Sequence, residues 1–398
     1  MTTTPDGRPA FHAQFYSHDS VGFGHVRRNL ALANALAREL PVRTGMPGVG
    51  LVLTGEPEAA RFPRPNGFDV LVLPGITKRG RQYAPRHAGF ALDDLVDMRG
   101  SLLNGLWAAE APDLLVIDRH VFGIDGELKK GLKKLRKRSP HTKVVLGLRE
   151  VLDSPEVVAK EWAAVDPQSL DRIVDEVWVY GDAAVHNAAA TGELPQPLAQ
   201  KAFFTGYLAN GRPTSAQAPE HRSDERLILT TAGAGSDGLP LTLAAARAEV
   251  PAGMRHVVVT GPQLPQARHD QVVRAARPGT EVLRSADVAQ LMDDAHAVIT
   301  MGGYNSVCEV LASTAPALIV PRVVPRLEQE IRARSLEKVG AVDVLHPRDL
   351  TAEALSGWLA RSVGSDAQRI ARRSINLDGL ANVANHVVTT MAKEPIHV

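Results

Sequence analysis

Short apolar runs alternate with amphipathic stretches along almost the whole chain, and this alternation restricts the possible folds more than any other feature. Runs such as "DLLVIDR" (113–119) and "HVVVTG" (256–261) are almost continuously apolar. That pattern is typical of strands buried on both faces of a parallel sheet. Helical patterns between successive runs favour strand–helix–strand units. The sequence therefore predicts an α/β protein with Rossmann-like, doubly wound sheets.

A polar stretch without periodicity divides the chain of 398 residues, which is too long for one compact core. Residues 209–225 read "ANGRPTSAQAPEHRSDE", a composition that favours a linker. On each side of it, a strand precedes a glycine-rich loop. We expect the chain to be organised as a disordered tail at 1–10, an N-terminal domain at 11–208, a linker at 209–225, a C-terminal domain at 226–375 and a helix within 376–398. The cleft between the two domains is the expected site.

The charge balance gives no reason to expect nucleic acid as a partner, because the formal net charge is +1. The one strongly basic segment, 127–138, lacks interleaved aromatic residues. It is either a solvated helix face or a patch for an anionic acceptor or a membrane surface. The single cysteine, Cys308, excludes an intramolecular disulfide. No signal-like start and no apolar run of roughly 20 residues is present, so we expect a cytoplasmic protein.

The loop "SVGFGHVRRN" (20–29) joins the first predicted strand to a helix. Gly22, Phe23 and Gly24 form a tight turn that brings backbone N–H groups and a helix N-terminus toward a ligand, which favours an anion. A dinucleotide fingerprint would place a third glycine where this chain has Arg27. Glu56 does follow the second strand, so a dinucleotide site is disfavoured but stays an alternative.

Four titratable residues are candidates for catalysis in the N-terminal half. His25 lies in the first turn of the helix, where it could take a proton from an acceptor hydroxyl. His18 and Asp19 close the preceding strand and are rivals for that role. Asp118 ends another strand, so its side chain could orient the histidine or bind the acceptor. The alternative is that these residues only complete turns.

In the second half, the sequence around "MGGYNSVCEVL" (301–311) resembles a strand end followed by a helix. We expect the helix to begin near Ser306. Glu309 then either forms a capping box with Ser306 or accepts two hydroxyl hydrogen bonds from a ribose. Further on, Arg322, Glu328 and Gln329 could contact phosphate and sugar hydroxyls. These charges could equally belong to a solvated amphipathic helix.

Together, these motifs resemble a known family. The segments "GGYNSVCEVL", "PALIVPR" and "EQEIRA" look like the donor-binding half of GT-B glycosyltransferases. They are similar to the peptidoglycan-type N-acetylglucosaminyltransferases of family 28, and most of all to a group of predicted bacterial glycosyltransferases. The segments "HDSVGFGHVRRNLALA" and "GLREVLDSPEVV" extend the resemblance into the first half, so that it covers roughly 15–350.

The resemblance implies a role for each matching residue. Gly22, Gly24 and His25 correspond to the glycine–glycine–histidine loop on the acceptor side. Glu309 would hold the donor ribose, Val288 would lie beside the base, and Glu328 and Gln329 would contact the donor sugar. The residues expected to meet the diphosphate are Gly233, Gly235, Ser236, Gly302, Gly303, Tyr304, Asn305 and Ser306. The family also suggests that the helix within 376–398 packs back on the N-terminal domain.

The expected reaction is an inverting transfer of a sugar from a nucleoside-diphosphate sugar to a hydroxyl of a small-molecule acceptor, in specialised metabolism. No cofactor or metal is expected, since the acidic doublets at 93–94 and 293–294 fall in helical patterns. The loop G-F-G-H is shorter than the glycine run of the peptidoglycan enzymes, which disfavours a lipid-diphosphate acceptor. A nucleotide-sugar 2-epimerase or hydrolase of the same fold, and a non-catalytic binding protein, stay open as alternatives.

Overall fold

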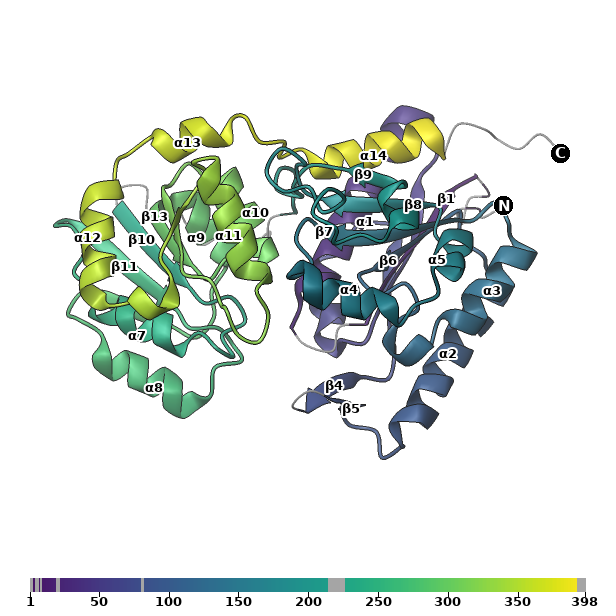
Figure 1. The fold of residues 1–398 in the computed structure, drawn as a ribbon, viewed down its shortest axis with the longest axis horizontal. Helices are drawn as coiled ribbons and strands as arrows, with labels where there is room; N and C mark the ends of the chain where they lie inside the picture. The colour runs from purple at the N-terminus through teal and green to yellow at the C-terminus, as the bar shows by residue number, and fades with distance from the viewer. Residues whose placement is uncertain are drawn as a thin grey trace.

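The computed structural model describes residues 3, 7, 9–18, 22–79, 82–213 and 226–391. Two α/β units lie side by side, each built on a parallel sheet (Figure 1). Much of the predicted tail at 1–10, and residues 214–225 of the predicted linker, lie outside the described residues.

The N-terminal sheet has the strand order β3-β2-β1-β6-β7-β8-β9, with all neighbours parallel. Its strands are β1 (Phe11–Ser17), β2 (Gly48–Thr54), β3 (Phe68–Val72), β6 (Leu114–Asp118), β7 (Lys143–Arg149), β8 (Glu176–Tyr180) and β9 (Ala202–Phe204). Its helices are α1 (Gly24–Thr44), α2 (Leu92–Ala109), α3 (Lys129–Arg138), α4 (Pro155–Ala163), α5 (Pro167–Ile173) and α6 (Gln196–Ala199), with 3-10 turns η1 (Pro57–Arg61) and η2 (Ile124–Gly126).

The C-terminal sheet has the order β12-β11-β10-β13-β14-β15, again parallel. Its strands are β10 (Arg226–Thr231), β11 (Met254–Val259), β12 (Thr280–Leu283), β13 (Ala295–Thr300), β14 (Ala317–Ile319) and β15 (Asp343–Val344). Its helices are α7 (Leu239–Arg247), α8 (Gln266–Ala275), α9 (Val288–Asp294), α10 (Tyr304–Ala312), α11 (Glu328–Lys338), α12 (Ala352–Ser362) and α13 (Ala367–Arg372), with the 3-10 turn η3 (Pro347–Asp349). These two sheets confirm the predicted pair of Rossmann-like units.

The strand orders determine where each unit can bind a ligand. The order reverses between β1 and β6 in the first sheet and between β10 and β13 in the second. In open parallel sheets, ligands bind at the carboxyl ends of the strands on either side of such a reversal. The relevant loops therefore follow β1 and β6 in one unit, and β10 and β13 in the other.

Helix α1 carries the first of these loops and is fixed by a buried apolar face. Leu30, Leu36 and Leu40 are almost fully buried in one continuous core. The final helix, α14 (Gly379–Thr390), crosses from the C-terminal unit to pack against α1 (Figure 1).

Two local expectations differ from the structure. Sequence reasoning missed the antiparallel hairpin of β4 (Ile76–Arg79) and β5 (Gln82–Pro85). In addition, α10 begins at Tyr304 rather than near Ser306, and Gly303 is its N-cap without a side-chain hydrogen bond. The capping box of Ser306 and Glu309 is therefore wrong, because Ser306 already lies inside the helix.

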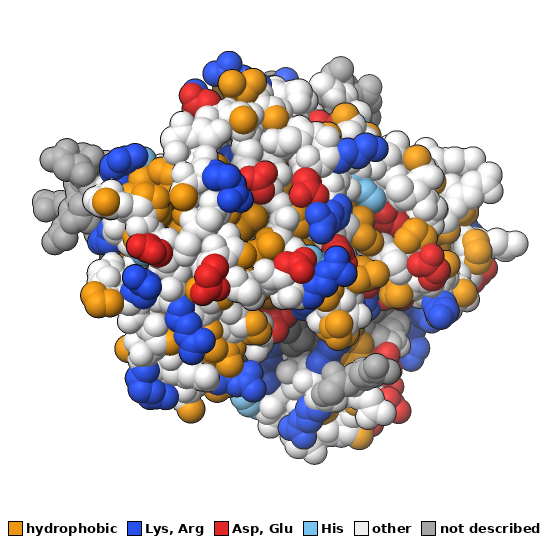
Figure 2. Space-filling model, turned by 60° about the vertical axis from the view of Figure 1, so that its left-hand side comes forward, with side chains coloured by type: hydrophobic (Ala, Val, Ile, Leu, Met, Phe, Trp, Pro, Cys, Tyr) orange, Lys and Arg blue, Asp and Glu red, His pale blue; other side chains and the backbone are white. Residues whose placement is uncertain are grey.

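Charges of both signs are interspersed over the face of the molecule drawn in Figure 2. On helix α3, the lysines are exposed while Leu132 and Leu135 are buried. Arg136 turns inward to pair with Asp175 at 2.5 Å.

We expect Leu36→Ala to lower the free energy of unfolding by about 2–5 kcal/mol, because it leaves a cavity between α1 and its sheet. Val42→Ala on the same helix, at a side chain that is 81% exposed, is the matched control and should change it little. Urea unfolding measures both. Equal effects of the two substitutions would contradict the packing of α1 described above.

Candidate functional site

A histidine and an aspartate meet where the N-terminal sheet reverses its order. His25, in the first turn of α1, has its Nδ1 at 3.0 Å from Oδ1 of Asp118, the last residue of β6. Arg28, one turn further along α1, donates from Nη2 to both Asp118 oxygens at 2.9 and 2.7 Å. Sequence reasoning offered Asp118 as a group that could orient the histidine or bind the acceptor, and the structure places it in contact with His25.

The electrostatics keep Asp118 ionised. Burial alone would raise its pKa, but the charge of Arg28 and the hydrogen bonds from His25 and Arg28 hold the pKa of this carboxyl well below its usual range. An ionised carboxylate accepts hydrogen bonds only. A hydrogen bond from His25 to Asp118 therefore requires a proton on Nδ1, and in the neutral form of the ring this leaves Nε2 as the acceptor.

Two further histidines surround this pair. The ring of His18 lies 5.2 Å from that of His25 and 5.1 Å from that of His120, centroid to centroid. Burial lowers the pKa of His18 well below its usual value, and burial with the charge of Arg119 lowers that of His120 to about 3. Both rings are therefore neutral near pH 7. Asp19, the other predicted candidate here, lies outside the described residues.

In the C-terminal unit, the loop after β13 leads through Gly302 and Gly303 into α10. The backbone N–H groups in the first turn of a helix have no partner within the helix, and they favour negative charge. Only 9% of the Glu309 side chain is exposed, and Arg27 reaches it across the domain interface at 3.4 Å. Burial raises the pKa of Glu309, although the charges of Arg27 and Arg212 oppose this.

The loop after β10 lies at the other side of the reversal in the C-terminal sheet. Gly235 has a φ of +91°, and a Cβ there would lie 2.1 Å from the carbonyl oxygen of Thr260, so only glycine fits. Gly233 and Ser236 are exposed. Val288 begins α9 and packs against the core beside this loop. Gly233 and Ser236 are therefore accessible from solvent, although the N–H of Gly233 already donates to Thr231 at 3.2 Å.

The predicted sugar-contacting residues form a charged cluster between the two units. Glu328 pairs with Arg149 of the N-terminal unit at 2.6 Å and with Arg322 at 3.2 Å. Gln329 accepts the backbone N–H of Arg322 at 3.0 Å. Burial alone would raise the pKa of Glu328, but the charges of Arg149, Arg332 and Arg322 lower it to about 2.

Direct contacts join the two units. Asn305 donates to the backbone carbonyl of Gly24 at 3.2 Å. Arg326 pairs with Asp153 at 3.1 Å and with Glu161 at 2.7 Å. Loops at the carboxyl ends of the two sheets are therefore in contact with each other.

Some residues of this site were missed by sequence reasoning. Arg28, Arg149 and His120 carry no motif of their own, since a charge in a helix or at a strand end is commonplace. The one signal for His120 is its place two residues after Asp118 in "VIDRH" (116–120).

Other observations bear on the alternatives. Glu56, the residue that could suit a dinucleotide, pairs with Arg86 at 2.8 Å and also accepts the backbone N–H of Glu58. Within the described residues, no helix is long and apolar enough to span a membrane, and no group of three or more His, Cys, Asp or Glu side chains could hold a metal ion.

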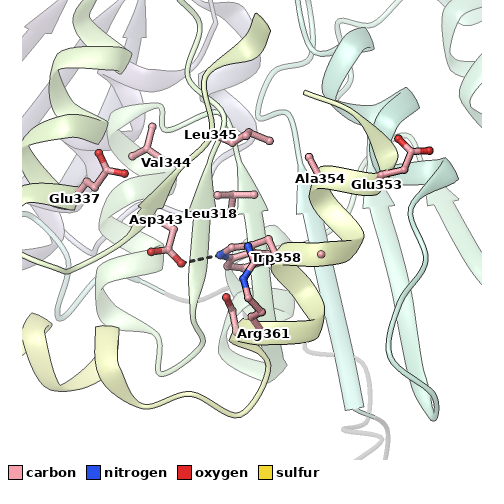
Figure 3. Close-up of a pocket in the computed structure, with 11 residues that line it drawn as sticks. Leu318, Glu337, Asp343, Val344, Leu345, Glu353, Ala354, Trp358 and Arg361 are labelled. Carbon is pink, nitrogen blue, oxygen red and sulfur yellow. Dashed lines mark hydrogen bonds between the residues drawn. The ribbon is translucent and has the colours of Figure 1, made fainter. Parts of the chain in front are cut away.

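A separate pocket lies between β15 and α12 of the C-terminal unit (Figure 3). Trp358 in it donates to Asp343 at 2.7 Å, and the pocket residue Glu337 pairs with Arg334 at 2.7 Å. None of the predicted site residues lines this pocket, which is therefore distinct from the site between the units.

Comparison with solved structures decides the fold. The calicheamicin glycosyltransferase CalG4 superposes with a TM-score of 0.62 over 97% of this chain and 99% of its own, at 17% identity. MurG from Acinetobacter baumannii superposes with a TM-score of 0.57 over 96% of this chain and all of its own, at 15% identity. The chain has the GT-B fold.

The family resemblance holds in the C-terminal half of this GT-B chain, where residues 241–387 match the glycosyltransferase family 28 C-terminal domain. A curated relative from Chelativorans sp. (strain BNC1), named UDP-N-acetylglucosamine–N-acetylmuramyl-(pentapeptide) pyrophosphoryl-undecaprenol N-acetylglucosamine transferase, is 27% identical over 205 residues. That match covers 45% of this chain and 51% of the relative. A protein of the same name from Bartonella quintana (strain Toulouse) is 32% identical over 77 residues, 19% of this chain and 20% of its own. The chain thus spans about half the length, or less, of these relatives.

We expect Glu328→Gln to make the free energy of unfolding depend less on pH than it does in the wild type. Because the folded-state pKa of Glu328 is depressed, its stabilisation is present above the unfolded value and is lost as the pH falls toward about 2. A shift of this size corresponds to about 3 kcal/mol at neutral pH. Urea unfolding from pH 7 to pH 2.5 measures it, with Glu337→Gln in an exposed pair as the control. If the free energy of unfolding changed with pH in the same way in wild type and in Glu328→Gln, the ion pairs described for Glu328 would not stabilise the fold.

Proposed function

We propose that this protein is a glycosyltransferase that moves a sugar from a nucleoside-diphosphate sugar to a hydroxyl of a small-molecule acceptor. One observation carries the proposal. The His25–Asp118 pair of the N-terminal unit faces the start of α10 and the buried Glu309 of the C-terminal unit, with Arg27 of α1 only 3.4 Å from Glu309. A base and an anion-binding helix end thus face each other across the cleft.

In the proposed reaction, Nε2 of His25 takes the proton of the acceptor hydroxyl as its oxygen attacks the anomeric carbon. The bond from that carbon to the diphosphate oxygen breaks, and the nucleoside diphosphate leaves from the opposite face, so the configuration inverts. Asp118 stabilises the imidazolium that forms. The backbone N–H groups at the start of α10 and in the loop 232–238 stabilise the charge of the leaving group, without a metal ion in this proposal.

For the donor, we propose that Glu309 accepts hydrogen bonds from both ribose hydroxyls. Arg27, whose side chain is 49% exposed, is free to turn away toward solvent or toward the diphosphate when a nucleotide enters. Glu328 and Gln329 lie where they could contact the sugar. Glu328 would do so with the lone pairs that Arg149 and Arg322 leave unused.

For the acceptor, we propose a small molecule of specialised metabolism, modified in the cytoplasm. The structural relatives include the calicheamicin glycosyltransferase and the spinosyn rhamnosyltransferase SpnG, whose names refer to such products. The neutral rings of His18 and His120 would form the wall against which such an acceptor packs.

The first test is thermal-shift binding across nucleoside diphosphates and their sugars. We expect a nucleotide to stabilise the wild type, and Glu309→Ala to lose most of this effect, since the ribose loses its acceptor for two hydrogen bonds worth about 1.5–3 kcal/mol each. Glu337→Ala, on the same unit but at the separate pocket, is the control. Stabilisation by none of the nucleotides would overturn the proposal.

The second test replaces the base. We expect His25→Ala to lower turnover about 10²- to 10⁴-fold while nucleotide affinity stays unchanged, because the base acts only on the acceptor. His141→Ala, at an exposed histidine of the same unit, is the control. Release of nucleoside diphosphate with and without added acceptor is the measurement. Interconversion of the donor sugar without acceptor would instead favour the epimerase alternative.

A further inference from the structure

Tyr304 occupies an unusual place for the first residue of a ligand-binding helix. Two buried guanidinium groups lie over its ring, with the Cζ of Arg28 5.4 Å and the Cζ of Arg332 5.8 Å from the ring centroid. Its hydroxyl accepts the backbone N–H of Leu208 at 3.2 Å. Only 3% of the residue is exposed. The side chain is therefore part of the contact between the units rather than of the open loop surface.

Each of the two arginines is fixed by a carboxylate of the N-terminal unit. Arg28 holds Asp118 through two hydrogen bonds, and its Nη2 also lies 3.0 Å from Nδ1 of His25. Arg332 belongs to the C-terminal unit but pairs with the buried Glu150 at 2.7 Å. Its Nη1 donates to the carbonyl of Gly302, just before α10, at 3.3 Å.

Successive contacts therefore link the His25–Asp118 pair to the start of α10. Asp118 contacts Arg28, and Arg28 contacts Tyr304, the first residue of α10. Arg332 also contacts Tyr304 and pairs with Glu150. A guanidinium over a desolvated aromatic face is attracted by the negative charge of the ring face. Arg28 thus contacts both Tyr304 of the C-terminal unit and the Asp118 that pairs with His25.

We propose that Tyr304 is a positioning residue that couples the start of α10 to the geometry of the His25–Asp118 pair. The proposal rests on the proposed function, in which the start of α10 receives the diphosphate. Asn305 supports the same coupling, since it bridges Gly24, adjacent to His25, and Arg212 with hydrogen bonds of 3.2 and 3.0 Å. Loss of the ring would leave the nucleotide site in place but would remove one of the contacts that position Arg28 beside its ion pair with Asp118.

The test follows the ring of His25 directly, by NMR of the ligand-free protein at one fixed pH. Nη2 of Arg28 and Oδ1 of Asp118 each lie 3.0 Å from Nδ1 of His25, so the chemical shift of this nitrogen depends on where both groups lie. A displacement of Arg28 should therefore shift the Nδ1 signal of His25.

We expect Tyr304→Leu to shift the Nδ1 signal of His25, while Tyr304→Phe, which keeps the ring, leaves that signal at its wild-type position. Ser335→Ala is the control, since it removes an interface contact with His186 far along α11 and should leave His25 unchanged. Where Tyr304→Leu does not fold, Tyr304→Met fills the space without an aromatic face. An unchanged Nδ1 signal in both Tyr304→Leu and Tyr304→Met overturns the proposal.

A second measurement separates this proposal from the proposed function. UDP and dTDP are titrated into wild type and Tyr304→Leu by calorimetry, and the His25 signal is followed at saturation. We expect nucleotide affinity within about threefold of wild type, with the nucleotide shifting the His25 signal only when the ring is present. Failure of every nucleotide to bind the wild type would overturn the proposed function, while the ligand-free NMR spectra would still decide the role of Tyr304. Nucleotide binding with an equal His25 response in both proteins would overturn the coupling alone.

Discussion

The buried ion pair of Arg28 and Asp118 is the interaction on which the rest of the site depends. Both side chains are almost completely buried, at 2% and 1% exposure, so each charge is stable only because the other is present. A helix and a strand of the first unit are thereby fixed to each other at the point where the sheet order reverses. The same pair orients His25 and supports the ring of Tyr304 from the second unit.

The two units meet through ion pairs as well as through an apolar core that continues from one unit into the other. Arg149 with Glu328, Arg326 with Asp153 and Arg332 with Glu150 each join one unit to the other. Loss of one partner of a fully buried pair such as Arg332–Glu150 would leave the other charge buried and unpaired, which is strongly destabilising. These pairs therefore fix how the two units sit against each other.

Sequence reasoning predicted both sheets, because continuous apolar strands and alternating helices leave few other solutions. It also selected His25 and Asp118, since residues at strand ends and helix starts face the ligand edge. It left contact between them as one of several alternatives, because that contact depends on the strand order. Arg28 and Arg149 have no local signature, and the hairpin of β4 and β5 carries too little apolar periodicity to be read as strands. The start of α10 was misplaced because Tyr304 and Asn305 are poor helix formers that are held in place by the other unit.

The return of α14 to the first unit has a mechanical consequence. The chain passes out of that unit after Leu208 and comes back before Gly379, and the two passages are hydrogen-bonded to each other. Tyr207 donates to Asn376, Asn210 donates to Leu377, and Gly379 donates back to Tyr207. Because the two passages are hydrogen-bonded to each other, they form a single connection at one edge of the units. We expect the units to rotate about this connection as about a hinge. Sliding or twisting, which would move His25 away from the start of α10, would break those hydrogen bonds.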